Sequence, residues 1–157
     1  MTSTATYTDK IIPSWEETFK LSDELAMKLL PRKHEFKTVV AVTRGGLIPA
    51  TIVARRLDIK SIDTVGITSY EGDTMSEQGN LKIIKSIPGN GEGCLVIDDL
   101  VDKGTTAQVI REMLPKSVIA VLYAKPSGKP YADVYVGECA QHTWVEFPWE
   151  KYGPFTK

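Results

Sequence analysis

One stretch of the chain, residues 94–107, constrains the fold more than any other, because strand, acid and helix-start signals follow one another within it. Residues 94–97 are apolar and partly β-branched, as in a buried strand, and two aspartates, Asp98 and Asp99, follow directly. Gly104 then precedes a predicted helix start. A helix N-terminus offers unpaired N–H groups and a positive dipole end, and glycine lets an anion approach the backbone. The stretch therefore predicts an anion site at a strand end.

Acidic side chains beside an anion site need a separate explanation, because carboxylates repel phosphate. We expect Asp98, Asp99 and Asp102 to face something else, such as a sugar diol, a divalent metal or a proton to be removed. A plainer interpretation makes Asp98 and Asp99 solvated strand-end residues and Thr105 a helix cap. The rest of the chain has to decide between the two.

Composition excludes several kinds of protein. The 157 residues match one domain, 1–157, and a net charge of -1 with a pI near 6.1 provides no general attraction to nucleic acid. Membrane contact is expected to be peripheral at most, because no apolar run approaches the roughly 20 residues of a membrane helix. The polar N-terminal segment has no apolar core like that of a signal peptide, so a cytoplasmic location is expected. Cys94 and Cys139 are expected to stay reduced.

Strands and helices are predicted to alternate along the chain. A capping-box pair, Ser14 and Glu17, starts a helix whose apolar face is expected to include Trp15 and Phe19, and residues 1–11 before it are predicted to be frayed. The other elements are predicted from continuous apolar runs, from the alternation of apolar and polar residues, and from glycine or proline residues that end an element. The predicted elements are helices at 15–30, 47–57 and 105–114, strands at 38–43, 61–69, 81–87, 94–97, 117–124 and 133–136, and a mobile loop at 70–80.

This alternation predicts the fold class. We expect an α/β fold with a mostly parallel sheet, helices on both faces, and ligands beyond the carboxyl ends of the strands. Arg44, residues 98–106 and Lys125 each follow or end a predicted strand. These segments are therefore expected to gather at one edge of the sheet.

Five short motifs are spread along the chain. The central one is residues 96–106 (VIDDLVDKGTT), and the flanking ones are 42–49 (VTRGGLIP), 68–70 (TSY), 123–126 (YAKP) and 143–146 (TWVE), the last followed by Pro148 and Trp149. Together they resemble the type I phosphoribosyltransferases, and within them the bacterial xanthine-guanine phosphoribosyltransferases. The likeness runs from about residue 15 to 150. One motif alone would be moderate evidence, whereas five in register are strong.

The resemblance implies the type I phosphoribosyltransferase fold and the transfer of ribose 5-phosphate from phosphoribosyl pyrophosphate to a purine nitrogen, with release of pyrophosphate. Asp98 and Asp99 are implied to face the ribose hydroxyls and Mg²⁺, the expected cofactor and metal, whose ligands are hard oxygens. This gives the acids beside the anion site a role. The implied 5′-phosphate-binding residues are Asp102, Lys103, Gly104, Thr105 and Thr106.

Pyrophosphate is implied to bind at a separate loop. A guanidinium can contact phosphate oxygens bidentately, and glycine amides leave room for close approach. The loop 70–80 is implied to close as a lid that keeps water from the reacting carbon, with a plain surface loop as the alternative. The peptide bond before Arg44 is a candidate for the cis form. The implied pyrophosphate-binding residues are Arg44, Gly45, Gly46, Ser69 and Tyr70.

The purine base is implied to lie between Lys125, which donates to its 6-oxo group, and Trp144, which stacks on it, under a small hood formed by the tail 126–157. A charged donor opposes the donor at position 6 of adenine, so adenine is expected to be a poor substrate. Asp102 is the implied general base for the N7 proton. Taken singly, Lys125 and Trp144 are also compatible with a solvated strand end and a packed tail aromatic. Further implied base-site residues are Val145 and, more weakly, Glu150.

Two other functions stay open at this point. One is a transferase of the same family that prefers hypoxanthine, and the other is a regulator that senses the phosphoribosyl ligand without catalysis. The regulator is disfavoured because a basic stripe is absent and Asp102, Lys125 and Trp144 are all retained. Lys103 departs from the family pattern, which usually has a small hydroxyl residue there. The implied partners are phosphoribosyl pyrophosphate, a purine base and further copies of the chain, in a homodimer or homotetramer.

Overall fold

Strands and helices alternate as the sequence predicts, in a computed structural model that describes residues 7–69 and 81–156. The loop predicted at 70–80 lies outside the described residues. The strands are β1 (Asp9–Ile11), β2 (Thr38–Thr43), β3 (Ser61–Ser69), β4 (Leu81–Lys85), β5 (Cys94–Val101), β6 (Val118–Ala124), β7 (Val134–Glu138) and β8 (Thr143–Val145). The helices are α1 (Trp15–Leu29), α2 (Leu47–Arg56) and α3 (Thr105–Met113), with short 3-10 helices η1 (Leu30–Glu35), η2 (Lys129–Tyr131) and η3 (Pro148–Glu150).

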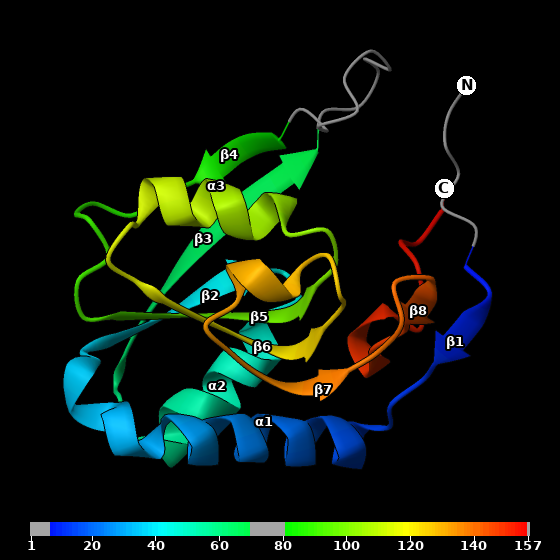
Figure 1. Cartoon of the computed structure of the whole chain (residues 1–157), viewed down its shortest axis with the longest axis horizontal. Helices are drawn as coiled ribbons and strands as arrows, with labels where there is room; N and C mark the ends of the chain where they lie inside the picture. Colours follow the sequence, from blue (N-terminus) through cyan, green and yellow to red (C-terminus); the bar gives the residue numbers. More distant parts are fainter. Residues whose placement is uncertain (1–6, 70–80, 157) are drawn as a thin grey trace.

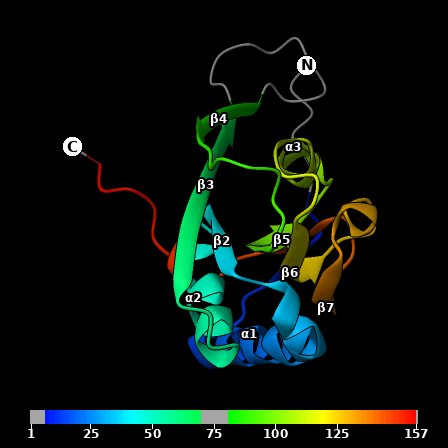
Figure 2. The same ribbon diagram turned by 90° about the vertical axis from the view of Figure 1, so that its left-hand side faces the viewer.

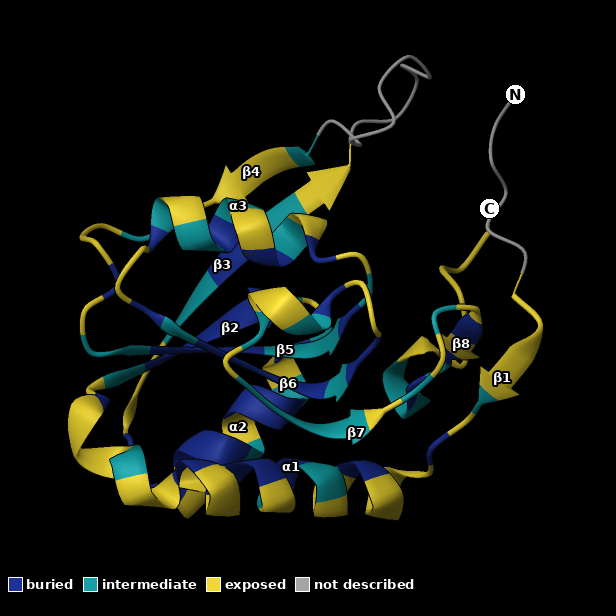
Figure 3. Cartoon of the chain, viewed as in Figure 1, coloured by how far each residue is buried: buried dark blue, intermediate teal, exposed yellow. Residues whose placement is uncertain are grey.

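Six strands form the main sheet in the order β4-β3-β2-β5-β6-β7, and all neighbours are parallel except β3 and β4. A parallel sheet needs cover on both faces. Figure 1 and Figure 2 show α1 and α2 on one face and α3 on the other, and each face has its own buried apolar cluster. Residues 95–97 of β5 are fully buried between them (Figure 3). The predicted fold class is confirmed, and none of the helices among the described residues is long and apolar enough to cross a membrane.

Helix α1 begins as predicted, and Leu25, Ala26 and Leu29 are buried as expected, but its first turns bury residues other than Trp15 and Phe19. Ser14 and Glu17 form the expected capping box. Trp15 and Phe19, however, are 59% and 51% exposed, whereas Thr18 and Ser22 are buried, so this part of the prediction is wrong. The reason is local, because each buried hydroxyl donates to the carbonyl four residues earlier and so enters the core without an unpaired polar group.

Residues 9–11, part of the end predicted to be frayed, form strand β1, while residues 1–6 lie outside the described residues. Strand β1 pairs in parallel with β8, and Lys10 lies opposite Trp144. The tail also differs from a separate hood, because β7 is the edge strand of the main sheet beside β6. The part of the tail after β7 lies outside the main sheet, next to β1 (Figure 1), and so does η2 before β7.

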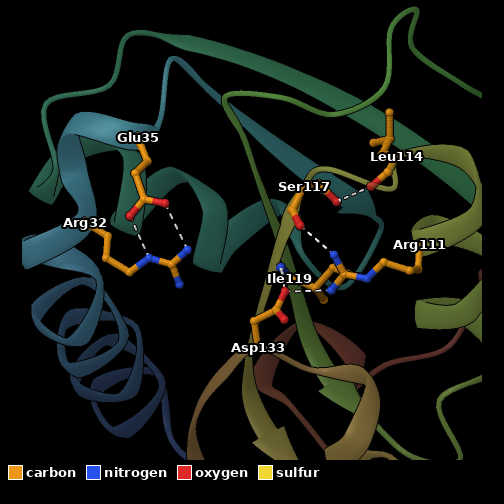
Figure 4. A network of polar contacts seen from close by, with 7 residues as sticks. All are labelled: Arg32, Glu35, Arg111, Leu114, Ser117, Ile119 and Asp133. Atoms are coloured by element: carbon orange, nitrogen blue, oxygen red, sulfur yellow. Dashed lines mark hydrogen bonds and ion pairs between the residues drawn. The ribbon is translucent and has the colours of Figure 1, made fainter.

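A polar network ties α3 to the two strands that follow it. The Asp133 carboxylate accepts hydrogen bonds from the Ile119 amide at 2.8 Å and from the Arg111 guanidinium at 2.6 Å. Arg111 also donates to the Ser117 carbonyl, as Figure 4 shows. Helix α3, whose N-terminus carries the predicted phosphate loop, is therefore anchored near its C-terminal end.

Candidate active site

The carboxyl ends of β2, β5 and β6 bring the predicted site residues together. These strands are adjacent in the sheet, and Val101 at the end of β5 lies opposite Ala124 at the end of β6. Arg44 follows β2 directly, and Lys125 follows β6 directly. The sequence-based placement of these segments at one sheet edge is confirmed.

The predicted phosphate loop is a glycine-capped helix start. Gly104 is the N-cap of α3 at φ 87°, a left-handed conformation that side chains rarely adopt. A Cβ at Gly104 would also lie 2.8 Å from Cε2 of Tyr131 and closer still to its Cδ2, so the ring packs directly on the loop. Thr105 is therefore the first helical residue and not the cap. A cavity of 120 Å³ lies against the predicted loop residues, which are 102–106.

The two vicinal acids line different cavities, although their carboxyl groups lie close enough to interact with each other. Asp98 lines the 120 Å³ cavity at the phosphate loop, and Asp99 lines a second cavity of 760 Å³ with Arg44 and Gly45. Burial, together with the charge of Asp99, raises the pKa of Asp98 well above its usual value, and burial also raises the pKa of Asp99. An unpaired carboxylate is thus costly in both positions, which favours a cation or a hydrogen-bond donor there.

Asp98 and Asp99 can supply only some of the ligands that a divalent cation needs. Among residues 7–69 and 81–156, no cluster of three or more histidine, cysteine, aspartate or glutamate side chains could hold a metal. Mg²⁺ is commonly held by one or two carboxylates, with substrate phosphates and water as the other ligands. Asp98 and Asp99 match that kind of site.

The Arg44 loop lies where the sequence predicts it, but its two glycine amides differ in how free they are to donate to an anion. The peptide bond between Thr43 and Arg44 is cis. A Cβ at Gly45 would lie 2.8 Å or less from the carboxylate of Asp99, so this glycine lets the loop and the acid share one cavity. The amide of Gly46 donates to the Val42 carbonyl at 2.8 Å, which favours Gly45 over Gly46 as a donor to an anion, and the role of Gly46 stays a prediction. The Arg44 side chain and the Gly45 amide are therefore the favoured donors to the pyrophosphate.

The remaining pyrophosphate candidates are less well placed. Ser69 ends β3 at an exposed position, and β2 separates that strand from β5. Tyr70 lies outside the described residues. Glu150, predicted near the base, lines the 760 Å³ cavity with Arg44 and Asp99. Burial raises the pKa of Glu150, and the charge of Asp99 adds to the effect.

Asp102 and Lys125 meet directly. Lys125 is only 1% exposed, and its Nζ lies 3.2 Å from Oδ2 of Asp102, which is half-buried. Buried lysines are almost always paired. The implied general base and the implied 6-oxo donor are therefore one ion pair, with a separation close to that of neighbouring polar groups on a purine edge.

An aromatic side chain that the sequence did not single out covers this pair. The ring of Tyr7 lies 5.1 Å from Lys125 Nζ and 5.0 Å from the ring of Trp144, edge to face. Strand β1 holds Tyr7 there, since the Thr8 amide donates to the His142 carbonyl. Trp144 is 42% exposed and Val145 is buried in the same short strand, β8. Tyr7 went unnoticed because residues 1–11 carry no periodic pattern.

Gln141 is a second residue that sequence reasoning missed. Its Nε2 donates to Oδ1 of Asp102 at 2.7 Å, and its Oε1 accepts from the Ser127 amide at 2.9 Å. Trp149, which follows the fifth motif, also lies at the site, because it lines the 760 Å³ cavity and its indole N–H faces the Asp99 carboxylate and opposes the rise in the pKa of that group. Gln141 belongs to none of the five motifs, so no signal in the sequence pointed to it.

The comparisons with known proteins agree with this geometry. A family model described as "Phosphoribosyl transferase domain" matches residues 10–152. The chain belongs to the phosphoribosyltransferase family. Xanthine-guanine phosphoribosyltransferase of Desulfotalea psychrophila is 48% identical over 90% of this chain and 87% of its own length, and that of Gluconobacter oxydans is 47% identical over 87% and 82%.

A solved structure extends the agreement to the whole fold. The purine phosphoribosyltransferase of Pyrococcus horikoshii superposes with a TM-score of 0.78 at 28% identity, covering 96% of this chain and 99% of that one. The mostly parallel sheet with helices on both faces is thus the type I phosphoribosyltransferase fold. The protein is accordingly an enzyme that transfers a pentosyl group.

Proposed function

We propose that the protein acts in purine salvage and transfers the phosphoribosyl group from phosphoribosyl pyrophosphate to guanine or xanthine, with hypoxanthine as a further acceptor. The observation that carries this proposal is the ion pair of Lys125 and Asp102 at the carboxyl ends of β5 and β6, with the ring of Tyr7 in contact with both Lys125 and Trp144. The relatives of 48% and 47% identity, both named xanthine-guanine phosphoribosyltransferase, support the choice of bases.

The phosphoribosyl ligand would span the two cavities. Its 5′-phosphate fits the N-terminus of α3, where residues 102–106 line the smaller cavity and the helix dipole favours an anion. The pyrophosphate group fits the larger cavity, where Arg44 supplies a guanidinium. Asp98 and Asp99 lie between the two ends, so they can accept hydrogen bonds from the ribose hydroxyls.

Mg²⁺ is the cofactor that we propose for this site. Asp98 and Asp99 would hold it together with substrate oxygens and water. When bound, the ion stabilises the negative charge of the departing pyrophosphate. The raised pKa values of both acids support the assignment, because a cation removes the cost of ionising them.

The base would be bound and deprotonated by the ion pair. Lys125 donates to the 6-oxo group, and Asp102 takes the proton from N7 while N9 forms its bond to the sugar carbon. A lysine with no acceptor lone pair opposes the amino group of adenine, so discrimination against adenine follows from the same contact. Trp144 offers an exposed ring face for stacking.

Pyrophosphate release is the test. The protein is mixed with Mg²⁺, phosphoribosyl pyrophosphate and guanine, xanthine, hypoxanthine or adenine in turn. Turnover with guanine and xanthine and little with adenine is the expected result. Preferential turnover of hypoxanthine would replace the proposed base preference, and no turnover with any purine would refute the proposal.

The same proposal includes a homodimer or homotetramer and a cytoplasmic location. Helix α1 exposes Trp15 and Phe19, which a partner copy would cover at least in part. Light scattering of the purified protein measures the mass directly. A monomer at micromolar concentration would contradict the assembly but not the activity.

A further inference from the structure

The side chain of Gln141 links the two halves of the proposed base site. Its Nε2 donates to Oδ1 of Asp102 at 2.7 Å and approaches the carbonyl of the same residue at 3.4 Å. Its Oε1 accepts the Ser127 amide at 2.9 Å, in the turn that begins at Lys125. Gln141 therefore joins the loop that carries the acid to the turn that carries the lysine.

The orientation of the Gln141 amide is decided by its partners. The Ser127 amide can only donate, so the oxygen of Gln141 has to face it and the nitrogen has to face Asp102. A donor at 2.7 Å requires Oδ1 to be an unprotonated acceptor. The two oxygens of the Asp102 carboxylate are thereby made different, because Lys125 lies 3.2 Å from the other one, Oδ2.

We propose that Gln141 is a positioning residue that keeps Oδ1 of Asp102 as an acceptor, so that the proton of the purine is delivered to Oδ2. In that step the N7–H bond breaks, its electron pair stays with the purine ring, and an O–H bond forms at Oδ2. Oδ2 is the carboxylate oxygen beside Lys125, and Lys125 is the proposed donor to the 6-oxo group of the purine. The N7 and 6-oxo edge of the purine would therefore contact Oδ2 of Asp102 and Nζ of Lys125 at the same time. This inference rests on the proposed role of Asp102 as the general base.

Within residues 7–69 and 81–156, few charged groups lie near Asp102, so the effect of one substitution can be isolated. Lys125 faces it from the end of β6, the thiol of Cys139 lies close to both groups after β7, and Lys103 is its neighbour in the chain. Gln141 itself carries no charge. A change in the titration of Asp102 after a charge is introduced at Gln141 can therefore be attributed to that charge.

Gln141→Glu is the decisive variant. It keeps an oxygen for the Ser127 amide but replaces the donor with a second carboxylate oxygen, so that the two carboxylates hold one proton between them. We expect kcat at neutral pH to fall at least about tenfold, within the roughly 10²–10⁴-fold that a general base contributes. The acidic limb of the kcat–pH profile should move to higher pH, and KM for phosphoribosyl pyrophosphate should change less than about threefold.

Two further variants complete the experiment. Gln141→Leu removes the donor without adding a charge, so kcat should fall and the acidic limb should move to higher pH by less than in Gln141→Glu, because the lost hydrogen bond favoured the ionised carboxylate. Asn90→Asp adds the same charge to the turn before β5, where the new carboxylate can still accept the Glu92 amide, and it should leave both kcat and the profile unchanged. Thermal melting of each variant checks that it is folded, and Gln141→Leu carries the test if Gln141→Glu does not fold.

The outcomes separate this inference from the function that it rests on. If Asp102→Asn keeps wild-type turnover, Asp102 is not the base and the proposed mechanism fails. If Asp102→Asn is inactive while both Gln141 variants keep the wild-type kcat and pH profile, only the role of Gln141 is overturned. A lower kcat in Gln141→Glu with an unmoved acidic limb would likewise refute positioning of the proton.

Discussion

Gly104→Ala tests whether the phosphate loop is held by backbone conformation and by packing at once. At φ 87° an alanine would occupy the left-handed region, which costs about 1–2 kcal/mol. The new methyl group would also overlap the ring of Tyr131, whose Cε2 would be 2.8 Å away, and such overpacking typically costs about 1–3 kcal/mol. The two effects add to a loss of about 2–5 kcal/mol in the free energy of unfolding.

The steric part can be separated from the conformational part with a double-mutant cycle. Tyr131 is 38% exposed, so its ring can be removed without opening the core. In the Tyr131→Ala background, Gly104→Ala should cost only the conformational part, about 1–2 kcal/mol. The coupling energy should therefore be at least about 1 kcal/mol, well above the roughly 0.3–0.5 kcal/mol within which independent sites add.

Equilibrium unfolding in urea, followed by circular dichroism, measures all four proteins at pH 7. An unchanged m-value in each variant confirms that only stability has changed. Strict additivity of the two substitutions would show that the ring does not pack on Gly104. A loss below about 0.5 kcal/mol for Gly104→Ala alone would refute the conformational argument as well.

Three other changes have defined outcomes. Folding raises the pKa of Asp98, so ionised Asp98 destabilises the ligand-free protein at any pH above that raised pKa. Asp98→Asn should therefore raise the melting temperature at pH 8. This gain should vanish as the pH falls toward 3.8, the pKa of an aspartate in the unfolded chain. Asp133→Ala leaves the Ile119 amide unpaired and should cost about 1–3 kcal/mol in urea unfolding, and no loss would mean that water replaces the carboxylate. Tyr7→Ala uncovers Lys125, and losing a contact worth about 0.5–1 kcal/mol should lower KM for guanine about two- to fivefold. A higher KM for guanine would instead indicate that Tyr7 contacts the bound base and contributes to its affinity.

The part of the fold that sequence predicted best is the part with the strongest local pattern. The continuous apolar run at 94–97 favours a buried strand, which in the structure continues through Asp98 and Asp99 to Val101, and the glycine at 104 favours a turn into a helix. Arg44 and Lys125 follow similar runs, so their common edge was predictable from parallel pairing alone. In α1, by contrast, hydroxyl groups that bond back to their own helix replaced Trp15 and Phe19 in the core, which an apolar pattern does not reveal.

The missed site residues share a different cause. Tyr7 and Gln141 reach the site through contacts between segments far apart in the chain. Strands β1 and β8 are each three residues long, which is too short for any period to be recognised. A glutamine that binds through one donor and one acceptor has the same sequence signal as one that faces water.

The pairing of β1 with β8 also has a consequence for biosynthesis. Roughly 130 residues separate these strands in the chain, and at about 5–20 residues per second a ribosome needs roughly 7–26 s to add them. During that time the segment that carries Tyr7 has left the ribosome without the strand that it pairs with. The β1–β8 pair, which carries Trp144 and holds Tyr7 nearby, can therefore form only after every strand of the main sheet has been made.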